Sequence, residues 1–295
     1  DLYSQCAFLN ENLLDHSSYY SFRNRYARMV DRNFGGRRVQ IVASYQRLDE
    51  LEDILKAFSY RVQKVDCLDL PKKIYMNRVV ELTKDQKEAY ATMKSAALAQ
   101  LKGKMATAPH VLTQLMRLHQ ITCGHLKSDD GEITNFKHNR IEELIDVIDE
   151  MEGKVIIWAN YVHDIEEITK ELEKEYGDGC VAQYYGQVSS EDRQKAIKDF
   201  QDPKSKVKYF VGNTQTGGYG ITLTAASNVI YYSNSYDLEK RLQSEDRAHR
   251  IGQHKPVTYV DLIAEKTVDE KIIKALRKKI NIASTVMGDT VQDWI

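Results

Sequence analysis

Two arginines and a glutamine near the C-terminal end of the chain have types and spacing suited to phosphate chemistry. In LQSEDRAHRIGQHKP (residues 242–256), Gln243, Arg247 and Arg250 follow one another at helical intervals. An α-helix turns about 100° per residue, so these side chains would project from one face. A guanidinium is a charged fork that matches phosphate oxygens, and an amide adds donors or acceptors. The arginines could instead complement the helix dipole in the last turn before Gly252.

A glycine-rich loop lies upstream of the two arginines and could also contact an anion. VKYFVG (207–212) predicts a strand, and NTQTGGYGITLTAA (213–226) follows it with Gly217, Gly218 and Gly220. Glycine lets backbone N–H groups approach an anion closely, and α/β folds bind ligands at the carboxyl ends of their strands. The loop lacks the third glycine of a Rossmann fingerprint, and a turn that needs positive φ would also explain its glycines.

The elements that must position these residues alternate between helices and strands. From about residue 138, helices separate five apolar runs rich in β-branched and aromatic residues: KVIIWA (154–159), VAQYYG (181–186), VKYFVG (207–212), NVIYYS (228–233) and VTYVDLIA (257–264). This alternation predicts an α/β fold, with a parallel sheet covered by helices on both faces. Ser189 or Ser190 opens one helix, and a long basic helix closes the chain.

The earlier part of the chain reads as mainly helical. RLDELEDILKAF (47–58) and PHVLTQLMRLHQI (109–121) each place apolar residues on one helical stripe. LPKK (70–73) breaks this pattern, and IYMNRVVELT (74–83) then predicts a strand. The polar stretch LKSDDGEITN (126–135) marks a boundary before a second unit.

Composition fits a soluble globular protein of 295 residues with a net charge of −1. No apolar run approaches the roughly 18 residues of a membrane span, so no membrane partner is expected. The four cysteines form no CxxC pair and the eight histidines are scattered, so we expect a reduced cytoplasmic setting, bacterial, phage-encoded or other, and no metal site. Residues 21–64 carry ten Lys or Arg against five acids, a stretch that could follow phosphates or be a solvated face.

The glycine loop and the arginine segment, in this order, resemble motifs V and VI of superfamily-two helicase-like ATPases. DRAHRIGQ (246–253) is similar to the Swi/Snf-type branch of that superfamily. Other segments resemble the same family in the expected order, and together they cover nearly the whole chain: LYSQCAFL, SFRNRYA, FSYRVQKVDCLDLPKK, LMRLHQITCGH, KVIIWANYVHDI and YYGQVSSEDRQKAIKDFQ. The resemblance implies two RecA-like lobes that clamp ATP and step along duplex DNA as they open and close.

On this resemblance the chain is expected to be the C-terminal half of a longer enzyme. Residues 1–65 would be the tail of the first RecA-like lobe with a helical protrusion, residues 66–128 a linker strand and helical protrusion, and residues 129–295 the second lobe with its basic C-terminal helix. The sequence contains no GxxxxGK motif followed by serine or threonine, and no Asp-Glu pair ends an expected strand. ATP and Mg²⁺ would therefore be held mainly by the N-terminal lobe, and this chain alone is expected to be inactive.

The resemblance also implies roles for residues on the nucleotide side of the cleft. Arg250 and Arg247 would be arginine fingers, which stabilise charge on the transferring phosphoryl group. Gln243, Gly218 and Gly220 would line the cleft and help to position the nucleotide.

Three further residues would contact DNA through its backbone. Thr214, Gly186 and Ser189 offer short polar donors and exposed N–H groups, which read phosphates rather than sequence. The expected partner is thus duplex DNA without sequence specificity. Departures from the family pattern, with Gln215 in place of an arginine and Ser233 in place of an aspartate, put the coupling between DNA and nucleotide in doubt.

Two other functions stay open on the sequence. The chain could be a non-catalytic module that binds nucleic acid or protein on a helicase-lobe scaffold. It could also belong to an RNA-dependent helicase, which shares the chemistry and differs in substrate.

Overall fold

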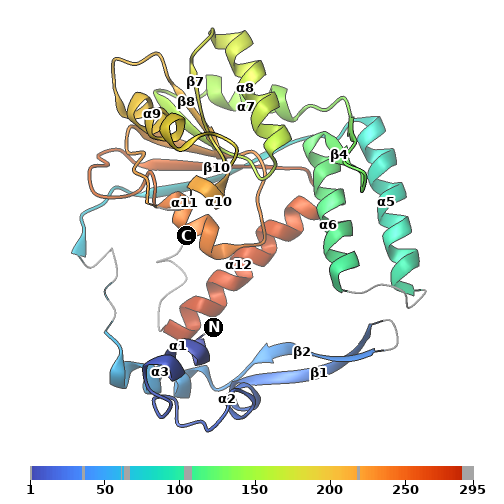
Figure 1. Cartoon of the computed structure of the whole chain (residues 1–295), viewed down its shortest axis with the longest axis vertical. Coiled ribbons are helices and arrows are strands. Elements are labelled where there is room, and N and C mark those ends of the chain that lie inside the picture. The colour runs from blue at the N-terminus through green and yellow to red at the C-terminus, as the bar shows by residue number, and fades with distance from the viewer. Residues whose placement is uncertain are drawn as a thin grey trace. The chain divides into compact units, whose positions relative to one another are not determined.

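The computed structural model describes residues 2–34, 37–60, 62, 67–102, 108–217 and 220–287. The chain divides into two compact units, the first of residues 1–67, 96–112 and 278–295 and the second of residues 68–95 and 113–277 (Figure 1). No helix in these described ranges is both long and apolar enough to cross a membrane.

The first unit holds three short helices and a hairpin around a small core. Its elements are α1 (Leu2–Leu9), α2 (Tyr19–Tyr26), β1 (Ala27–Phe34), β2 (Arg37–Tyr45) and α3 (Leu48–Phe58). Cys6, Leu14, Tyr26 and Leu51 form its buried core. α3 covers the predicted amphipathic segment and turns Leu51 inward, as the spacing of its apolar residues requires.

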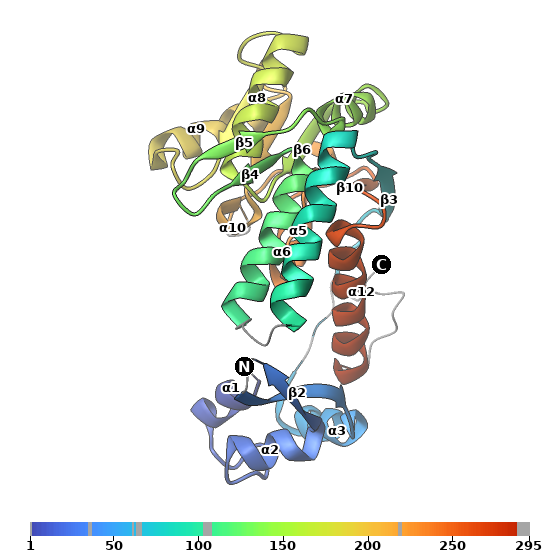
Figure 2. The same cartoon turned by 90° about the vertical axis from the view of Figure 1, so that its right-hand side faces the viewer.

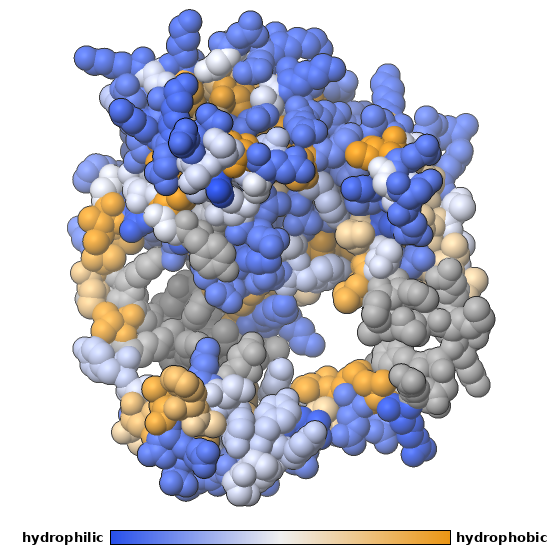
Figure 3. All heavy atoms as spheres, in the orientation of Figure 1, coloured by the Kyte–Doolittle hydropathy of each residue, from blue (hydrophilic) through white to orange (hydrophobic). Residues whose placement is uncertain are grey.

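The antiparallel hairpin of β1 and β2 differs from the mainly helical region that the sequence predicts. The two strands pair from Ala27 with Tyr45 to Phe34 with Arg37. The signal was present, because the dipeptide Gly35-Gly36 separates the strands and such a two-residue link is typical of hairpins. Apolar side chains gather over this hairpin in Figure 3.

The second unit is built on a parallel sheet, as predicted. Within the described residues the sheet has six strands in the order β3-β10-β9-β6-β8-β7, and every neighbouring pair is parallel. Five of them correspond to the five predicted apolar runs: β6 (Lys154–Trp158), β7 (Val181–Tyr184), β8 (Tyr209–Gly212), β9 (Ala226–Tyr231) and β10 (Val257–Ile263). The fold is thus the α/β arrangement of a RecA-like lobe.

The sixth strand comes from the segment expected to link the two lobes. β3 (Lys73–Val79) pairs with β10 in parallel from Lys73 with Val257 to Val79 with Ile263 and forms one edge of the sheet. The sequence predicts the strand but not its partner, because apolar alternation identifies a strand and gives no information on its neighbour.

Helices cover both faces of this sheet (Figures 1 and 2). α7 (Arg140–Asp149) and α8 (Val162–Tyr176) pack on one face, and α9 (Ser190–Gln201) packs on the other. The strands between them are apolar on both sides; in β6, Val155 and Ile157 point to the first face while Ile156 and Trp158 point to the second. Strands buried on both faces read as continuous apolar runs, which is why they were visible in the sequence.

Three longer helices and a small hairpin accompany the lobe. α5 (Lys84–Lys102) and α6 (Ala108–Cys123) lie side by side in both Figures 1 and 2, and α6 leads into the hairpin of β4 (His125–Lys127) and β5 (Ile133–Asn135). α12 (Val268–Met287) is the predicted basic helix. Its N-terminal half packs against α5 and α6 through a shared apolar cluster that includes Tyr90, Leu115, Leu118, Ile272 and Leu276.

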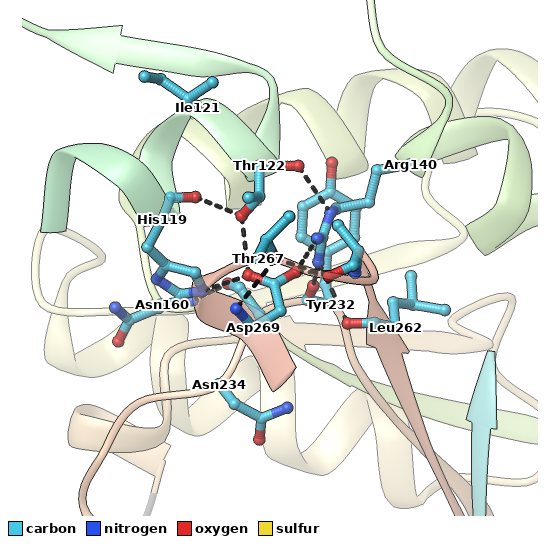
Figure 4. Close-up of polar contacts among 12 residues, drawn as sticks. His119, Ile121, Thr122, Arg140, Asn160, Tyr232, Asn234, Leu262, Thr267 and Asp269 are labelled. Carbon is cyan, nitrogen blue, oxygen red and sulfur yellow. Dashed lines mark hydrogen bonds and ion pairs between the residues drawn. The ribbon is translucent and has the colours of Figure 1, made fainter. Parts of the chain in front are cut away.

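A buried ionic network ties α6, α7 and α12 to the sheet (Figure 4). Arg140 is fully buried and forms an ion pair with Asp269, and its Nε donates to the Thr122 carbonyl at 3.1 Å. Asp269 also accepts from the Thr122 hydroxyl at 2.8 Å and from the Ala264 N–H at 3.1 Å. Burial opposes the charge of Asp269, but Arg140, His119 and the hydrogen bond from Ala264 together outweigh burial and keep the pKa of this carboxyl below its ordinary value.

Candidate functional site

α11 (Leu238–Glu245), the helix ahead of the two arginines, is fixed to the sheet by buried charges. Asp237 caps its start by accepting from the Lys240 N–H at 3.3 Å. Arg241 forms an ion pair with Asp261 of β10 at 2.5 Å and with Glu245 at 2.8 Å, and its guanidinium lies 3.5 Å from the centre of the Tyr231 ring. These contacts fix the position of α11 on the sheet and thereby hold the residues that follow it in place.

Glu245, the last residue of α11, connects this helix to the edge strand. Its Oε2 accepts from the Tyr75 hydroxyl at 2.7 Å and from the Lys73 ammonium at 3.0 Å, both in β3. Burial opposes ionisation of Glu245, but Arg241 and Lys73 outweigh it and lower the pKa of the carboxyl. Two charged residues of α11 and one of β3 therefore meet between the helix and the sheet.

The α-helix ends before both arginines, which corrects the expectation of one continuous helical face. After Glu245 the backbone makes shorter turns, with the Arg247 N–H donating to Ser244 and the Ala248 N–H to Glu245, both at 3.2 Å. The Arg247 carbonyl accepts from the Leu223 N–H at 2.9 Å instead of serving the next helical turn. A tertiary hydrogen bond thus replaces the helical one, and tertiary contacts commonly override a local helical pattern.

Arg247 and Arg250 nevertheless converge on one atom of the glycine-rich loop. Arg247 donates to the Ile221 carbonyl at 3.3 Å and Arg250 donates to the same carbonyl at 3.2 Å. Both side chains are half-buried, and in the described part of the chain neither forms an ion pair with a carboxylate. Burial and then the charge of Arg250 lower the pKa of Arg247, and the nearby charge of Asp246 offsets them only in part, so these two cations lie close together.

Gln243 is joined to Arg247 through its backbone rather than its amide. Its carbonyl accepts from Arg247 Nε at 2.8 Å, while its side-chain nitrogen donates to Glu239 at 2.8 Å. The side-chain oxygen of Gln243 is buried and has no hydrogen-bond partner among the described residues. An acceptor and two guanidiniums thus have capacity left for a ligand.

Of the two glycines assigned to the nucleotide side, the structure describes Gly220 but not Gly218. Gly220 is exposed, has a φ of +70° and precedes Ile221, the residue whose carbonyl both arginines contact. Its left-handed backbone explains why glycine is suited to this position. Gly218 lies outside the described residues.

The three residues assigned to DNA follow the carboxyl ends of adjacent parallel strands. Gly186 and Ser189 come after β7, and Thr214 comes after β8 at the start of the short helix α10 (Thr214–Gly217). Gly186 and Ser189 are exposed and Thr214 is half-buried. The Ser189 hydroxyl caps α9, accepting from the Asp192 N–H at 3.1 Å and donating to its carboxylate at 2.7 Å. The structure thus places all three residues beyond the carboxyl ends of β7 and β8, at one edge of the sheet.

Two asparagines, which the sequence gave no reason to select, hold this edge together. The Asn213 N–H donates to the Tyr184 carbonyl at 3.1 Å, and its side-chain amide donates to the Asn160 carbonyl at 2.8 Å. The Asn160 N–H donates to the hydroxyl of Ser233 at 2.8 Å, so Ser233 links the loops after β6 and β9. The signal was their place directly after predicted strands, where polar residues of an α/β fold gather.

Comparison with known proteins agrees with this geometry. The profile of the SNF2-related domain matches residues 1–127, and that of the helicase conserved C-terminal domain matches residues 137–252. The chain belongs to the Swi/Snf-type superfamily-two helicase-like ATPases. It shares 31% identity over 255 residues with human "SWI/SNF-related matrix-associated actin-dependent regulator of chromatin subfamily A member 1", an alignment that covers 81% of this chain and 24% of the relative.

Other Swi/Snf-type relatives come from bacteria and archaea. "Putative ATP-dependent helicase/translocase YwqA" of Bacillus subtilis (strain 168) is 25% identical over 308 residues, which cover 100% of this chain and 32% of that protein. The solved "Sulfolobus solfataricus SWI2/SNF2 ATPase core in complex with dsDNA" is 27% identical with a TM-score of 0.59, covering 100% of this chain and 60% of that one. The chain thus spans 24% to 32% of the length of these curated Swi/Snf-type relatives.

Proposed function

We propose that this chain supplies the second RecA-like lobe, with the arginine fingers, of an ATP-dependent DNA translocase. The observation that carries the proposal is the pair Arg247 and Arg250, whose guanidiniums meet at the Ile221 carbonyl without a carboxylate partner in the described ranges. Two half-buried guanidiniums that repel each other favour binding of an anion between them, and a triphosphate is the anion that Swi/Snf-type ATPases consume.

The residues present fit the phosphates of ATP. Arg250 and Arg247 would bind phosphate oxygens and stabilise the charge that develops during phosphoryl transfer. The unpartnered oxygen of Gln243 would accept a hydrogen bond from water or from the nucleotide. The phosphate cradle and the Mg²⁺ ligands would come from an N-terminal RecA-like lobe, since the chain has no GxxxxGK motif.

Duplex DNA is the partner that we propose for the opposite part of the site. Thr214, Gly186 and Ser189 lie after the adjacent strands β7 and β8, with exposed backbone and short hydroxyls suited to phosphates. A solved neighbour that is 27% identical is titled as a complex with dsDNA, which supports this assignment. We further propose a reducing compartment, because the four cysteines are free thiols.

Replacing Arg250 tests the arginine-finger assignment. In the protein that joins this chain to a P-loop lobe, we expect Arg250→Ala to lower the rate of DNA-stimulated ATP hydrolysis by about 10³-fold, the effect of removing an arginine finger elsewhere. The fold should persist, because Arg247 still contacts the Ile221 carbonyl. Steady-state ATPase assays and thermal unfolding measure the two quantities.

Arg78→Ala is the matched control. Arg78 is also a half-exposed arginine, but it lies in the edge strand β3 and pairs with Glu143 and Glu150 at the surface. Its variant should keep normal turnover. Normal turnover by Arg250→Ala would refute the assignment. Stimulation by RNA but not by duplex DNA would favour the RNA-helicase alternative, and no hydrolysis by the unmodified protein would favour the non-catalytic module.

A further inference from the structure

Two histidines and an aspartate from distant parts of the sequence meet inside the second unit. His125 begins β4, and His163 and Asp164 lie in the first turn of α8. One ligand atom from each side chain lies within 4.8 Å of the other two. The two imidazole rings stack with their centres 4.5 Å apart. The histidines look scattered in the sequence, which is why no metal site is expected there, and the fold brings two of them to one carboxylate.

Three polar atoms of this cluster are buried and lack a hydrogen bond in the described part of the chain. His125 is 2% exposed and Asp164 is 0% exposed, and His163 is half-buried. Within the described residues, Nδ1 of His125, Nδ1 of His163 and Oδ1 of Asp164 have no hydrogen-bond partner. The first and third atoms lie 3.0 Å apart but are not aligned for a hydrogen bond. Buried polar atoms without a hydrogen bond are rare in folded proteins, so three in one place suggest a missing ligand.

The atoms match the ligand set of a transition metal. Zinc binds imidazole nitrogen and carboxylate oxygen at about 2.0–2.2 Å in a tetrahedron, which places two ligand atoms about 3.3 Å apart. The 3.0 Å separation of His125 and Asp164 is near that value, and His163 is close enough to join by a small side-chain rotation. We propose that His125, His163 and Asp164 form a binding site for a divalent transition metal, with zinc as the ion that fits best.

The surroundings of the site favour this ion over the magnesium of the nucleotide. Mg²⁺ prefers oxygen ligands, whereas this set is two-thirds nitrogen. The site is also separate from the arginines: α8 packs on one face of the sheet, and Ile221 and Ala248 pack on the other. Half-burial of His163 leaves a route by which the ion can enter.

A second carboxylate, Glu167, lies near the cluster on the same helix as His163. Glu167 lies one turn after His163 on α8, and its Oε1 contacts Nε2 of His138 at 3.1 Å. Its Oε2 is buried without a hydrogen-bond partner in the described ranges. Burial opposes its charge, but His138, followed by His163 and His125, holds the pKa of Glu167 below its ordinary value. Glu167 therefore adds a negative charge near the cluster, while its Oε1 contacts His138 rather than a proposed ligand.

The bound metal would fasten the segment after α6 to the lobe. His125 belongs to the β4–β5 hairpin, whereas His163 and Asp164 belong to α8. One ion would therefore cross-link two elements that are far apart in the sequence. Metal binding to the folded state alone stabilises that state by mass action.

Zinc binding to the tag-free chain tests the site. After incubation with ZnCl₂ and gel filtration, elemental analysis should find about one zinc per chain. Thermal unfolding should shift upward by on the order of 5 °C at a hundredfold excess over Kd, and EDTA should reverse the shift. Cobalt in place of zinc should give the visible absorption bands of a tetrahedral complex.

Three variants separate this site from unspecific binding. His163→Ala removes a half-buried ligand and should abolish the bound zinc, whereas His254→Ala, at an exposed histidine elsewhere, should retain it. Glu167→Gln removes a negative charge near the cluster and should weaken zinc binding, since a nearby carboxylate attracts the cation. Equal zinc content in unmodified protein and His163→Ala, or no zinc in the unmodified protein, would overturn the proposal. None of these measurements depends on ATP hydrolysis.

Discussion

Gly212, at the end of β8, shows how a single residue keeps the site edge in register. A methyl group there would lie 2.6 Å from the Tyr184 backbone oxygen and 3.2 Å from the Trp158 ring. The backbone oxygen cannot move without breaking the pairing of β7 with β8, so a small structural shift cannot remove the clash. We expect Gly212→Ala to lower the free energy of unfolding by about 1–3 kcal/mol.

Gly186→Ala is the control for this change, because a methyl group at Gly186 meets nothing within 4 Å. Chemical denaturation of both variants measures the difference. Equal stability of the two variants would show that the β7 edge yields more easily than its packing implies.

At the residue scale the sequence predicts which side chains suit a chemical role better than it predicts which side chains contact one another. It selects Arg247 and Arg250 because guanidiniums suit phosphates, and the structure brings them together at Ile221. The sequence does not predict the pairing of Arg241 with Asp261, because an ion pair between residues 20 positions apart leaves no local pattern in the sequence. The same limit hides the meeting of His125 with Asp164.

At the scale of elements, α11 depends on buried charges that acid can remove. The folded-state pKa of Glu245 is lowered, so its contribution is complete above the unfolded value of about 4.5 and is lost as the pH falls through the folded-state pKa. Glu245→Gln loses that contribution at every pH. We expect this variant to be about 3 kcal/mol less stable at pH 7, and to lose less additional stability than the unmodified protein below pH of about 4.5.

Thermal unfolding from pH 7 to pH 3 measures both effects. Glu171→Gln, which breaks the surface pair with Lys174, makes the same chemical change and should cost less than about 1 kcal/mol. A Glu245→Gln variant with the stability and acid response of Glu171→Gln would contradict the role of Glu245.

The elements themselves were largely predictable, and the exceptions have physical causes. The apolar runs from KVIIWA to VTYVDLIA predict the strands β6 to β10 because strands buried on both faces consist mainly of apolar residues. α11 ends at Glu245 and not, as predicted, in the turn before Gly252, since the hydrogen bond from Leu223 to Arg247 is invisible in the sequence. The β1–β2 hairpin was missed although Gly35-Gly36 marks it.

For the molecule as a whole, the sheet of the second unit combines a strand that precedes α5 and α6 in the sequence with strands that follow them. β3 precedes these helices and β6 to β10 follow them, yet β3 pairs along the full length of β10. A chain shortened to residues 129–295 would lose this strand, together with the Lys73 and Tyr75 partners of Glu245. It would also present an unpaired β10 edge, which invites association between copies.

We therefore expect residues 129–295 alone to form large assemblies and residues 68–295 to stay monomeric, as measured by size-exclusion chromatography with light scattering. Monomeric, stable behaviour of the shorter piece would show that β3 is dispensable.

The position of β3 also sets an order of events on the ribosome. This strand emerges long before β10, its neighbour in the sheet, has been translated. Until then its backbone must wait in water or find a temporary partner, and pairing across such a span is slow. Completion of the lobe is consequently a late step of biosynthesis, one at which a chaperone would have most effect.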